Sequence, residues 1–195
     1  MLDIKKVSVL KFLFVIYLLI PIWLWFDSIP VITVYSVGRL FGLLALSFVA
    51  LQPLLSSRLK MLENGVGHDR LMRWHGTNAK FATLLVLLHP VTMFSTYIER
   101  GVSPARISGY YDPTGFLLGY IMLFALLIII VTSIFTERLN LRYETWRKVH
   151  LMIYLVVFGG FIHSFLIGSN VQSGLFQLWW LGLLAIALTG FCIDM

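Results

Sequence analysis

Residues 74–90, WHGTNAKFATLLVLLHP, settle the class of fold. Most of this stretch is apolar, as a helix that crosses a membrane must be, yet His75 stands near its start and His89 near its end. A second stretch, VHLMIYLVVFGGFIHSF at 149–165, repeats the pattern with His150 and His163. Ionisable side chains inside membrane spans are rare and usually functional, so these four histidines are the first candidates for a site.

The composition supports a membrane protein. The 195 residues are 59% hydrophobic and 12% charged, whereas soluble domains are about 45–50% apolar and about 25% charged. The net charge of +6 lies in short connections between apolar segments, so it indicates topology and not nucleic-acid binding. The single cysteine, Cys192, excludes a disulfide within the chain. No cleavage site follows the first apolar run, so we expect no secretory signal peptide.

Six apolar segments are each long enough to cross a hydrocarbon core of about 30 Å. They predict an all-α fold: one six-helix transmembrane bundle over residues 1–195. Three prolines, Pro30, Pro104 and Pro113, fall in the connections, where helices should end. The polar segment GVGHDR at 65–70 is expected to be a loop with a solvated His68. The predicted spans are about 8–26, 34–56, 74–97, 115–135, 146–167 and 176–193.

The basic residues predict the orientation of these spans. Eleven lysines and arginines lie in the N-terminal segment and the second and fourth connections, against two in the other three connections. Positive charges favour the cytoplasmic side, so we expect a multi-pass protein of the cell membrane with both termini in the cytoplasm. Trp23, Trp25, Trp179 and Trp180 then fall near the outer boundary, as interface aromatics do. The eleven are Lys5, Lys6, Lys11, Arg58, Lys60, Arg70, Arg73, Arg138, Arg142, Arg147 and Lys148; the two are Arg100 and Arg106.

This topology places the histidines in two level pairs. The third and fifth spans run in the same direction, so His75 and His150 share a depth near the cytoplasm, and His89 and His163 share one toward the outer face. Separations of fourteen and thirteen residues correspond to about 21 Å and about 19.5 Å along a helix. Imidazole is a common axial ligand of haem iron. The pattern therefore predicts two stacked b-type haems between the third and fifth helices.

Other interpretations of the histidines remain open at this point. Buried histidines could relay protons in a non-redox transporter, or the haems could serve a cytochrome that handles quinol, although no quinone pocket is evident. Zinc is disfavoured because each pair lacks nearby Cys, Asp or Glu. Thirteen residues also leave His150 and His163 about 140° apart on an ideal helix. We expect either a local distortion at Gly159–Gly160, which would reduce this offset, or a close approach of the helix to the porphyrin there. Ordinary small-residue helix packing is the alternative explanation of the same glycines.

The six spans, the histidine spacings and the segments YETWRKVHLMIYLVVFGGFIHSF and TGFLLGYIMLFALLIIIVTS resemble the ferric reductase-like transmembrane domain of the NADPH oxidase and ferric reductase superfamily. The resemblance covers nearly the whole chain and looks nearest to bacterial NADPH oxidase homologues. It implies electron transfer from a cytosolic flavin through an inner and an outer haem to dioxygen, giving superoxide, or to a ferric chelate. The two haem irons would be bound by His75 with His150 and by His89 with His163.

Family oxidases continue into a flavin- and NADPH-binding dehydrogenase domain, and the segment after LTGFCIDM is absent from this sequence. We therefore expect FAD and NADPH to act through a missing or separate dehydrogenase domain on the cytoplasmic side. The haem-binding membrane subunit of a periplasmic methionine sulfoxide reductase system shares the fold, but it lacks a histidine that corresponds to His75. A haem-binding subunit of that kind remains an alternative to the oxidase or reductase.

Five basic side chains complete the set of candidates. Arg73, Arg147 and Lys148 flank the inner histidine pair and could bind haem propionates or a flavin phosphate, or they could only mark the cytoplasmic side. Arg39 resembles an arginine that the oxidase family places beside the outer haem, where it would bind a propionate of that haem or stabilise developing superoxide charge; snorkelling to the interface is the alternative. Lys80 lies at a depth where an ammonium group is costly. Its role stays open.

Overall fold

The computed structural model describes residues 4–29, 31–99, 101, 113–168 and 173–194, with side chains from Ser8 to Ile193. Within these ranges the regular structure is entirely helical, and six of the helical segments are long and apolar enough to cross a membrane. The predicted all-α fold with six candidate membrane spans is therefore confirmed for this part of the chain. Pro30, Pro104, Arg100 and Arg106 lie outside it. The helices are α1 (Ile4–Asp27), α2 (Val34–Ser56), α3 (Lys60–Val66), α4 (His68–Glu99), α6 (Pro113–Ile134), α7 (Tyr143–His150), α8 (Ile153–Ile167) and α9 (Gly174–Asp194).

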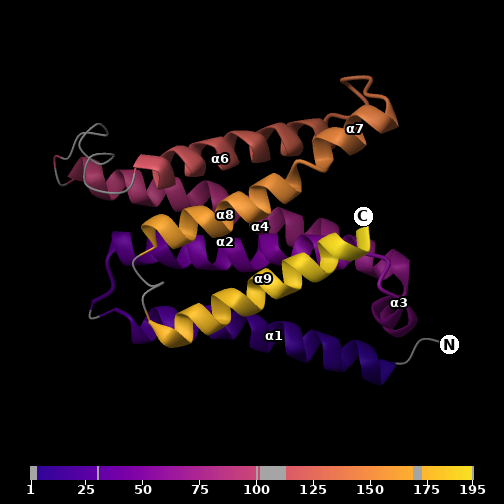
Figure 1. The fold of residues 1–195 in the computed structure, drawn as a ribbon, viewed down its shortest axis with the longest axis horizontal. Coiled ribbons are helices and arrows are strands. Elements are labelled where there is room, and N and C mark those ends of the chain that lie inside the picture. Colours follow the sequence, from indigo (N-terminus) through magenta and orange to yellow (C-terminus); the bar gives the residue numbers. More distant parts are fainter. Residues whose placement is uncertain (1–3, 30, 100, 102–112, 169–172, 195) are drawn as a thin grey trace. The chain divides into compact units, whose positions relative to one another are not determined.

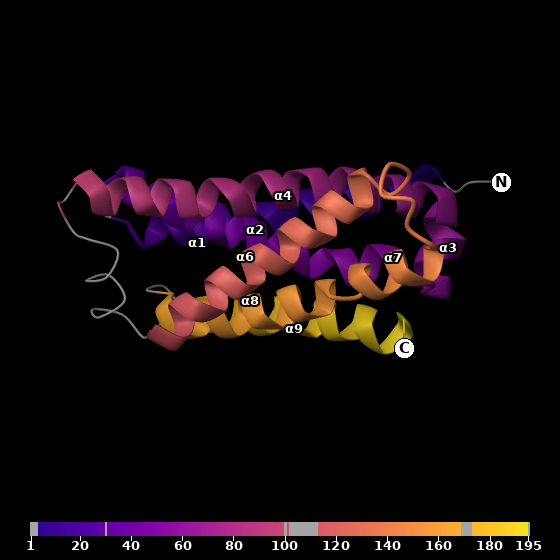
Figure 2. The same ribbon diagram turned by 90° about the horizontal axis from the view of Figure 1, so that it is seen from above.

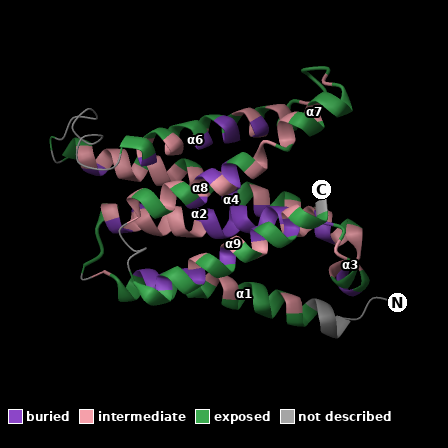
Figure 3. Ribbon diagram, in the orientation of Figure 1, coloured by how far each residue is buried: buried purple, intermediate pink, exposed green. Residues whose placement is uncertain are grey.

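The chain divides into two compact units, which are described separately. Unit 1 comprises residues 1–96 and 170–195, and unit 2 comprises residues 97–169. In unit 1, α2 is the central helix and contacts both α1 and α9 (Figures 1 and 2). Residues 45–53 of α2 are buried without interruption, the purple stretch on this helix in Figure 3. A helix that is apolar and covered on all sides is the expected centre of such a unit.

Two hydrogen bonds fix α1 against α2. The Tyr17 hydroxyl donates to the carbonyl of Ser47 at 2.7 Å, and Trp25 Nε1 donates to the carbonyl of Ser36 at 2.6 Å. Trp25 is buried (6% exposed), so its indole packs inside unit 1 against α2. At its start, α2 has a capping box in which Thr33 and Ser36 bond each other's backbone, satisfying amide groups that the helix cannot pair.

Unit 2 consists mainly of α6 packed along α8, with α7 also in contact with α6 (Figures 1 and 2). Gly159 of α8 is buried, and a β-carbon at this position would collide with the side chain of Met122 on α6. The helix α8 is continuous through residues 159–160. The predicted distortion at Gly159–Gly160 is therefore wrong, and Gly159 instead permits close packing of two helices.

The fifth predicted span is interrupted elsewhere, between α7 and α8. Leu151 and Met152 have ψ angles of −16° and −10°, and the Met152 amide bonds the carbonyl of Val149 at 3.0 Å. These are features of a 3₁₀ turn, which rotates about 120° per residue and not about 100°. Each residue in such a turn therefore rotates the chain about 20° further than a residue of an α-helix does. This extra rotation reduces the offset of about 140° that we expected between His150 and His163.

The polar segment before the third span is more ordered than the sequence suggested. Residues 60–66 form α3, and α4 begins at His68 and not near Trp74. Gly67 separates the two helices with a φ of 88°, a conformation that favours glycine. The prediction of a loop at His68 is wrong: its side chain is 41% exposed, and Nδ1 lies 3.2 Å from Glu63 Oε1 on α3. His68 is therefore a helix-terminal residue with an acidic partner.

Candidate functional site

The candidate histidines of unit 1 lie on one uninterrupted helix. His75 and His89 are both half-buried residues of α4. Fourteen residues of α-helix rotate to within about 40° of the starting direction. Both rings therefore leave α4 on nearly the same side, as the sequence predicted.

The ring of His89 is held by α2. Its Nδ1 lies 2.8 Å from the carbonyl oxygen of Gly38. A carbonyl can only accept, so Nδ1 carries the proton. In the neutral imidazole the lone pair is then on Nε2, the nitrogen that can bind a metal. Gly42, one turn further along α2, lies directly against the ring, because a β-carbon built there would be 2.9 Å from both Cε1 and Nδ1 of His89.

The same arrangement recurs in unit 2 with different residues. The Nδ1 of His163 on α8 lies 2.7 Å from the carbonyl oxygen of Gly115 on α6, which again assigns the proton to Nδ1. A β-carbon on Gly119 would be 2.7 Å from Cε1 and 2.9 Å from Nδ1 of His163. We call each arrangement a glycine cradle: Gly38 and Gly42 around His89, and Gly115 and Gly119 around His163.

His150 has different surroundings. It ends α7, and its Nδ1 lies 3.3 Å from the hydroxyl oxygen of Ser133 on α6. A hydroxyl can donate or accept, so this contact alone does not decide which ring nitrogen is protonated. The indole of Trp146, one helical turn earlier, stacks on the imidazole with 5.0 Å between ring centroids and 26° between planes. Trp146 restricts the orientation of the ring on one face.

Asn78 is a buried polar residue that the sequence analysis did not single out. It lies one turn after His75 on α4, is 5% exposed, and its Nδ2 donates to the carbonyl of Phe48 on α2 at 2.7 Å. This bond joins α4 to α2 at the level of His75, as the His89 bond does further along. A lone asparagine in an apolar span was the available signal, because buried amides need partners.

Arg39 follows Gly38 directly, so it lies on the turn of α2 that accepts the His89 bond. It is half-buried, and its Nη2 is 3.4 Å from the Ser28 hydroxyl just after α1. The structure therefore brings Arg39 and His89 to the same end of unit 1.

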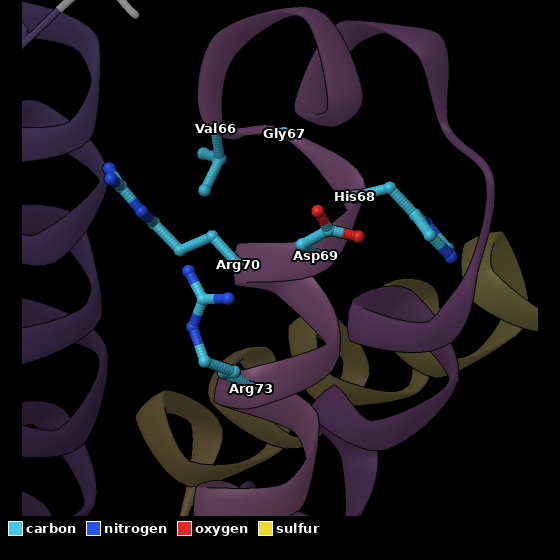
Figure 4. A pocket seen from close by; sticks show the side chains of 6 residues that line it. All are labelled: Val66, Gly67, His68, Asp69, Arg70 and Arg73. Atoms are coloured by element: carbon cyan, nitrogen blue, oxygen red, sulfur yellow. The ribbon is translucent and has the colours of Figure 1, made fainter.

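The other basic candidates have exposed side chains. Arg73 is near the start of α4, Lys80 is further along it, and Arg147 and Lys148 are on α7. Arg73 is one of the residues that line an open pocket at the α3–α4 junction (Figure 4). In Figure 4 the guanidinium groups of Arg70 and Arg73 lie on the same side of α4, away from the ring of His68. The pocket is lined by Val66, Gly67, His68, Asp69, Arg70 and Arg73.

The donor set suits haem better than a protein-only metal cage. In the part of the chain that the structure describes, no three His, Cys, Asp or Glu side chains gather into a group that could hold a metal ion. A histidine whose Nε2 carries the lone pair is instead what axial ligation of a porphyrin iron requires. His89 in unit 1 and His163 in unit 2 each have this form, so each fits as an axial ligand of a haem.

Comparison with known families gives one match. A family model described as ferric reductase like transmembrane component matches residues 41–161, more than half of the chain. These residues include His75, His89 and His150, and His163 follows shortly after their end. No curated protein matches the chain. The family match and the six apolar helices together establish that this chain belongs to the ferric reductase-like transmembrane family.

Proposed function

We propose that the protein moves electrons outward across a membrane through two haem b groups, of the kind used by NADPH oxidases. His75 and His150 would be the ligands of the inner haem iron, and His89 and His163 those of the outer one. The family supports transmembrane electron transfer by an oxidoreductase membrane domain. The pairing of the ligands follows from the predicted orientation, in which the third and fifth spans run in the same direction.

The observation that supports this proposal most directly is the hydrogen bonding of His89 and His163. In both, Nδ1 donates to a backbone carbonyl, so Nε2 carries the lone pair that binds a metal. Metal-ligating histidines in proteins usually make this bond through their second nitrogen, because it fixes the tautomer and the ring direction. When bound, haem supplies an iron that takes up and passes on single electrons.

Electrons would enter at the cytoplasmic side from FAD, which NADPH reduces on a dehydrogenase domain or partner. Arg73, Arg147 and Lys148 would lie on this side and have exposed charged groups. They are therefore accessible to the phosphates of a flavin or to haem propionates, both of which bind basic side chains. Arg70 shares the pocket of Arg73 and adds a second guanidinium to it.

The acceptor at the outer side is proposed to be dioxygen, which one electron converts to superoxide. Arg39 would stabilise the developing negative charge, because a positive side chain in a poorly solvated setting favours an anion. Its place beside Gly38, whose carbonyl accepts from the proposed outer ligand His89, supports this role. A ferric chelate is the alternative acceptor within the same family.

Haem binding is tested by purifying the chain after expression with ample iron and haem precursor. We expect red protein with two haems per chain and a Soret band that shifts on addition of dithionite. Each histidine-to-alanine variant at the four proposed ligands should lose one haem, while His68→Ala, a matched histidine at the edge of α4, should keep both. Colourless wild-type protein would refute the proposal and favour the non-redox transporter.

The role of Arg39 is tested by mixing dithionite-reduced protein with oxygen and measuring superoxide as dismutase-sensitive cytochrome c reduction. Arg39→Ala should keep both haems but reduce oxygen about 10- to 100-fold more slowly, because a charge-assisted contact contributes about 1.5–3 kcal/mol. Arg58→Ala, which removes an exposed arginine beyond the end of α2, is the control. An unchanged rate in Arg39→Ala would exclude the role, and rapid oxidation only by ferric chelates would identify the alternative acceptor.

A further inference from the structure

Gly42 and Gly119 occupy equivalent places in the two glycine cradles. Each follows by four residues the glycine whose carbonyl accepts the Nδ1 bond, so each lies one helical turn away on the same face. Each also lies directly against the imidazole of a proposed haem ligand. The two cradles are built by different helices, α2 with α4 and α6 with α8. The recurrence in two separate units makes an accidental contact a poor explanation.

A methyl group has no space at either position. The β-carbon of an alanine would be 2.9 Å from ring atoms of His89 at position 42, and 2.7 Å from the nearest ring atom of His163 at position 119. Carbon atoms are normally separated by about 3.5–4.0 Å. Gly182 of α9 gives the contrast, since a β-carbon there meets nothing within 4 Å. Not every glycine in these spans is therefore enclosed by neighbouring atoms. Gly42 and Gly119 are enclosed, and the enclosing atoms belong to imidazole rings.

The imidazole cannot move aside without weakening its hydrogen bond to the backbone carbonyl. Rotation away from a methyl group would lengthen the Nδ1–carbonyl bond to Gly38 or Gly115, which is 2.8 Å or 2.7 Å long. The bond fixes the tautomer, makes Nε2 more basic and directs it. A ring displaced by a methyl group would present Nε2 in a new direction and with less electron density.

We propose that Gly42 and Gly119 are positioning residues for the outer haem: they let His89 and His163 lie with Nδ1 on a backbone carbonyl and Nε2 toward the iron. This inference rests on the proposed haem ligation. The two glycines touch neither iron nor acceptor and act through the histidines. Small residues also promote ordinary helix packing, but in both cradles the atoms that fill the space above the glycine belong to the ligand ring.

The inference predicts the direction of a redox change. A histidine that donates through Nδ1 gives more electron density to the iron, which favours the ferric state. Alanine at position 42 or 119 should weaken this donation and raise the reduction potential of the outer haem. Loss of the hydrogen-bonding partner of a metal-binding histidine typically lowers metal affinity about 10- to 100-fold. We expect an affinity loss of this size for the outer haem and none for the inner one.

The experiment compares Gly42→Ala, Gly119→Ala and the control Gly182→Ala in the purified chain of 195 residues. His89→Ala and His163→Ala are measured first, and the spectral component that both remove defines the outer haem. Haem content, the electron paramagnetic resonance spectrum of the ferric protein and the midpoint from a redox titration are then recorded. We expect both cradle variants to alter this component, with a higher midpoint, and the control to match the wild type.

Each alternative outcome has a distinct meaning. Cradle variants with the haem content, resonance spectrum and midpoint of the control would overturn the inference but leave the proposed function intact. Haem-free wild-type protein would overturn both. Circular dichroism identifies a variant that does not fold; because the cradles lie in separate units, the other variant then decides. Failure of both variants to fold would count against the inference, because it would assign the glycines to helix packing.

Discussion

Gly190 of α9 lies directly against the backbone of α2, and its replacement by alanine should be the most damaging of the glycine-to-alanine changes in unit 1. A β-carbon at this position would lie 2.5 Å from the carbonyl carbon of Pro53 and from the amide nitrogen of Leu54, and 2.7 Å from the β-carbon of Pro53. Two of these three atoms are backbone atoms of α2. No side-chain rotation can relieve the contact, so α9 must withdraw by about 1 Å to reach an ordinary separation.

The magnitude follows from two opposing effects. Adding a methyl group to a packed interior costs about 1–3 kcal/mol, whereas alanine is about 0.5–1 kcal/mol better than glycine inside a helix. Gly182→Ala on the same helix has only the second effect, because the position is exposed and a β-carbon there meets nothing within 4 Å. The difference in stability between the two variants therefore isolates the clash, at about 1–3 kcal/mol.

The assay is thermal unfolding of both variants in the same detergent, followed by circular dichroism. For a chain of this size, 1 kcal/mol corresponds to roughly 2–4 °C in Tm. We expect Gly190→Ala to melt below the wild type and Gly182→Ala at or slightly above it. If Gly190→Ala melts at the temperature of Gly182→Ala, the close approach of α9 to α2 is wrong.

Three further predictions concern packing within each unit. Gly159→Ala should destabilise unit 2 because its methyl group meets Met122, and the double variant with Met122→Ala should recover part of the lost Tm; no recovery would show that the two side chains do not meet. Trp25→Phe should lower stability by about 1 kcal/mol through loss of its bond to the Ser36 carbonyl, whereas Trp23→Phe, at an exposed position, should leave the Tm unchanged; equal effects would contradict the bond. Asn78→Ala should cost about 1–3 kcal/mol by removing a buried amide bond between helices, and a Tm within error of the wild type would exclude that contact.

Several features of the protein could be predicted from the sequence because they depend on local composition. Backbone groups in hydrocarbon must be bonded within their own segment, so apolar runs of about 20 residues can only be helices. This rule predicted the six spans. The spacing of His75 and His89 predicted that both rings leave one side of their helix, because α4 is uninterrupted between them. The sequence also carried enough of the family pattern to indicate the ferric reductase-like domain.

The tertiary structure decided the features that depend on a second helix. The sequence placed Trp25 only by its depth, whereas the structure shows that its indole bonds the Ser36 carbonyl of α2. Glycines 159 and 160 looked like a kink, but the interruption lies at Leu151–Met152, where nothing in the residue types required it. Local propensity is a weak guide at such positions, because packing against a neighbouring helix overrides it.

What the sequence by itself determined is therefore which segments enter the membrane and which of them carry histidines. What only the tertiary structure decided is which ring nitrogen carries the proton in His89 and His163. The carbonyl that accepts from His89 is 51 positions away in the chain, and the one that accepts from His163 is 48 positions away. Each partner is brought to the ring by the packing of separate helices. Whether Nε2 carries the lone pair is set by that contact, and no pattern within a single helix encodes it.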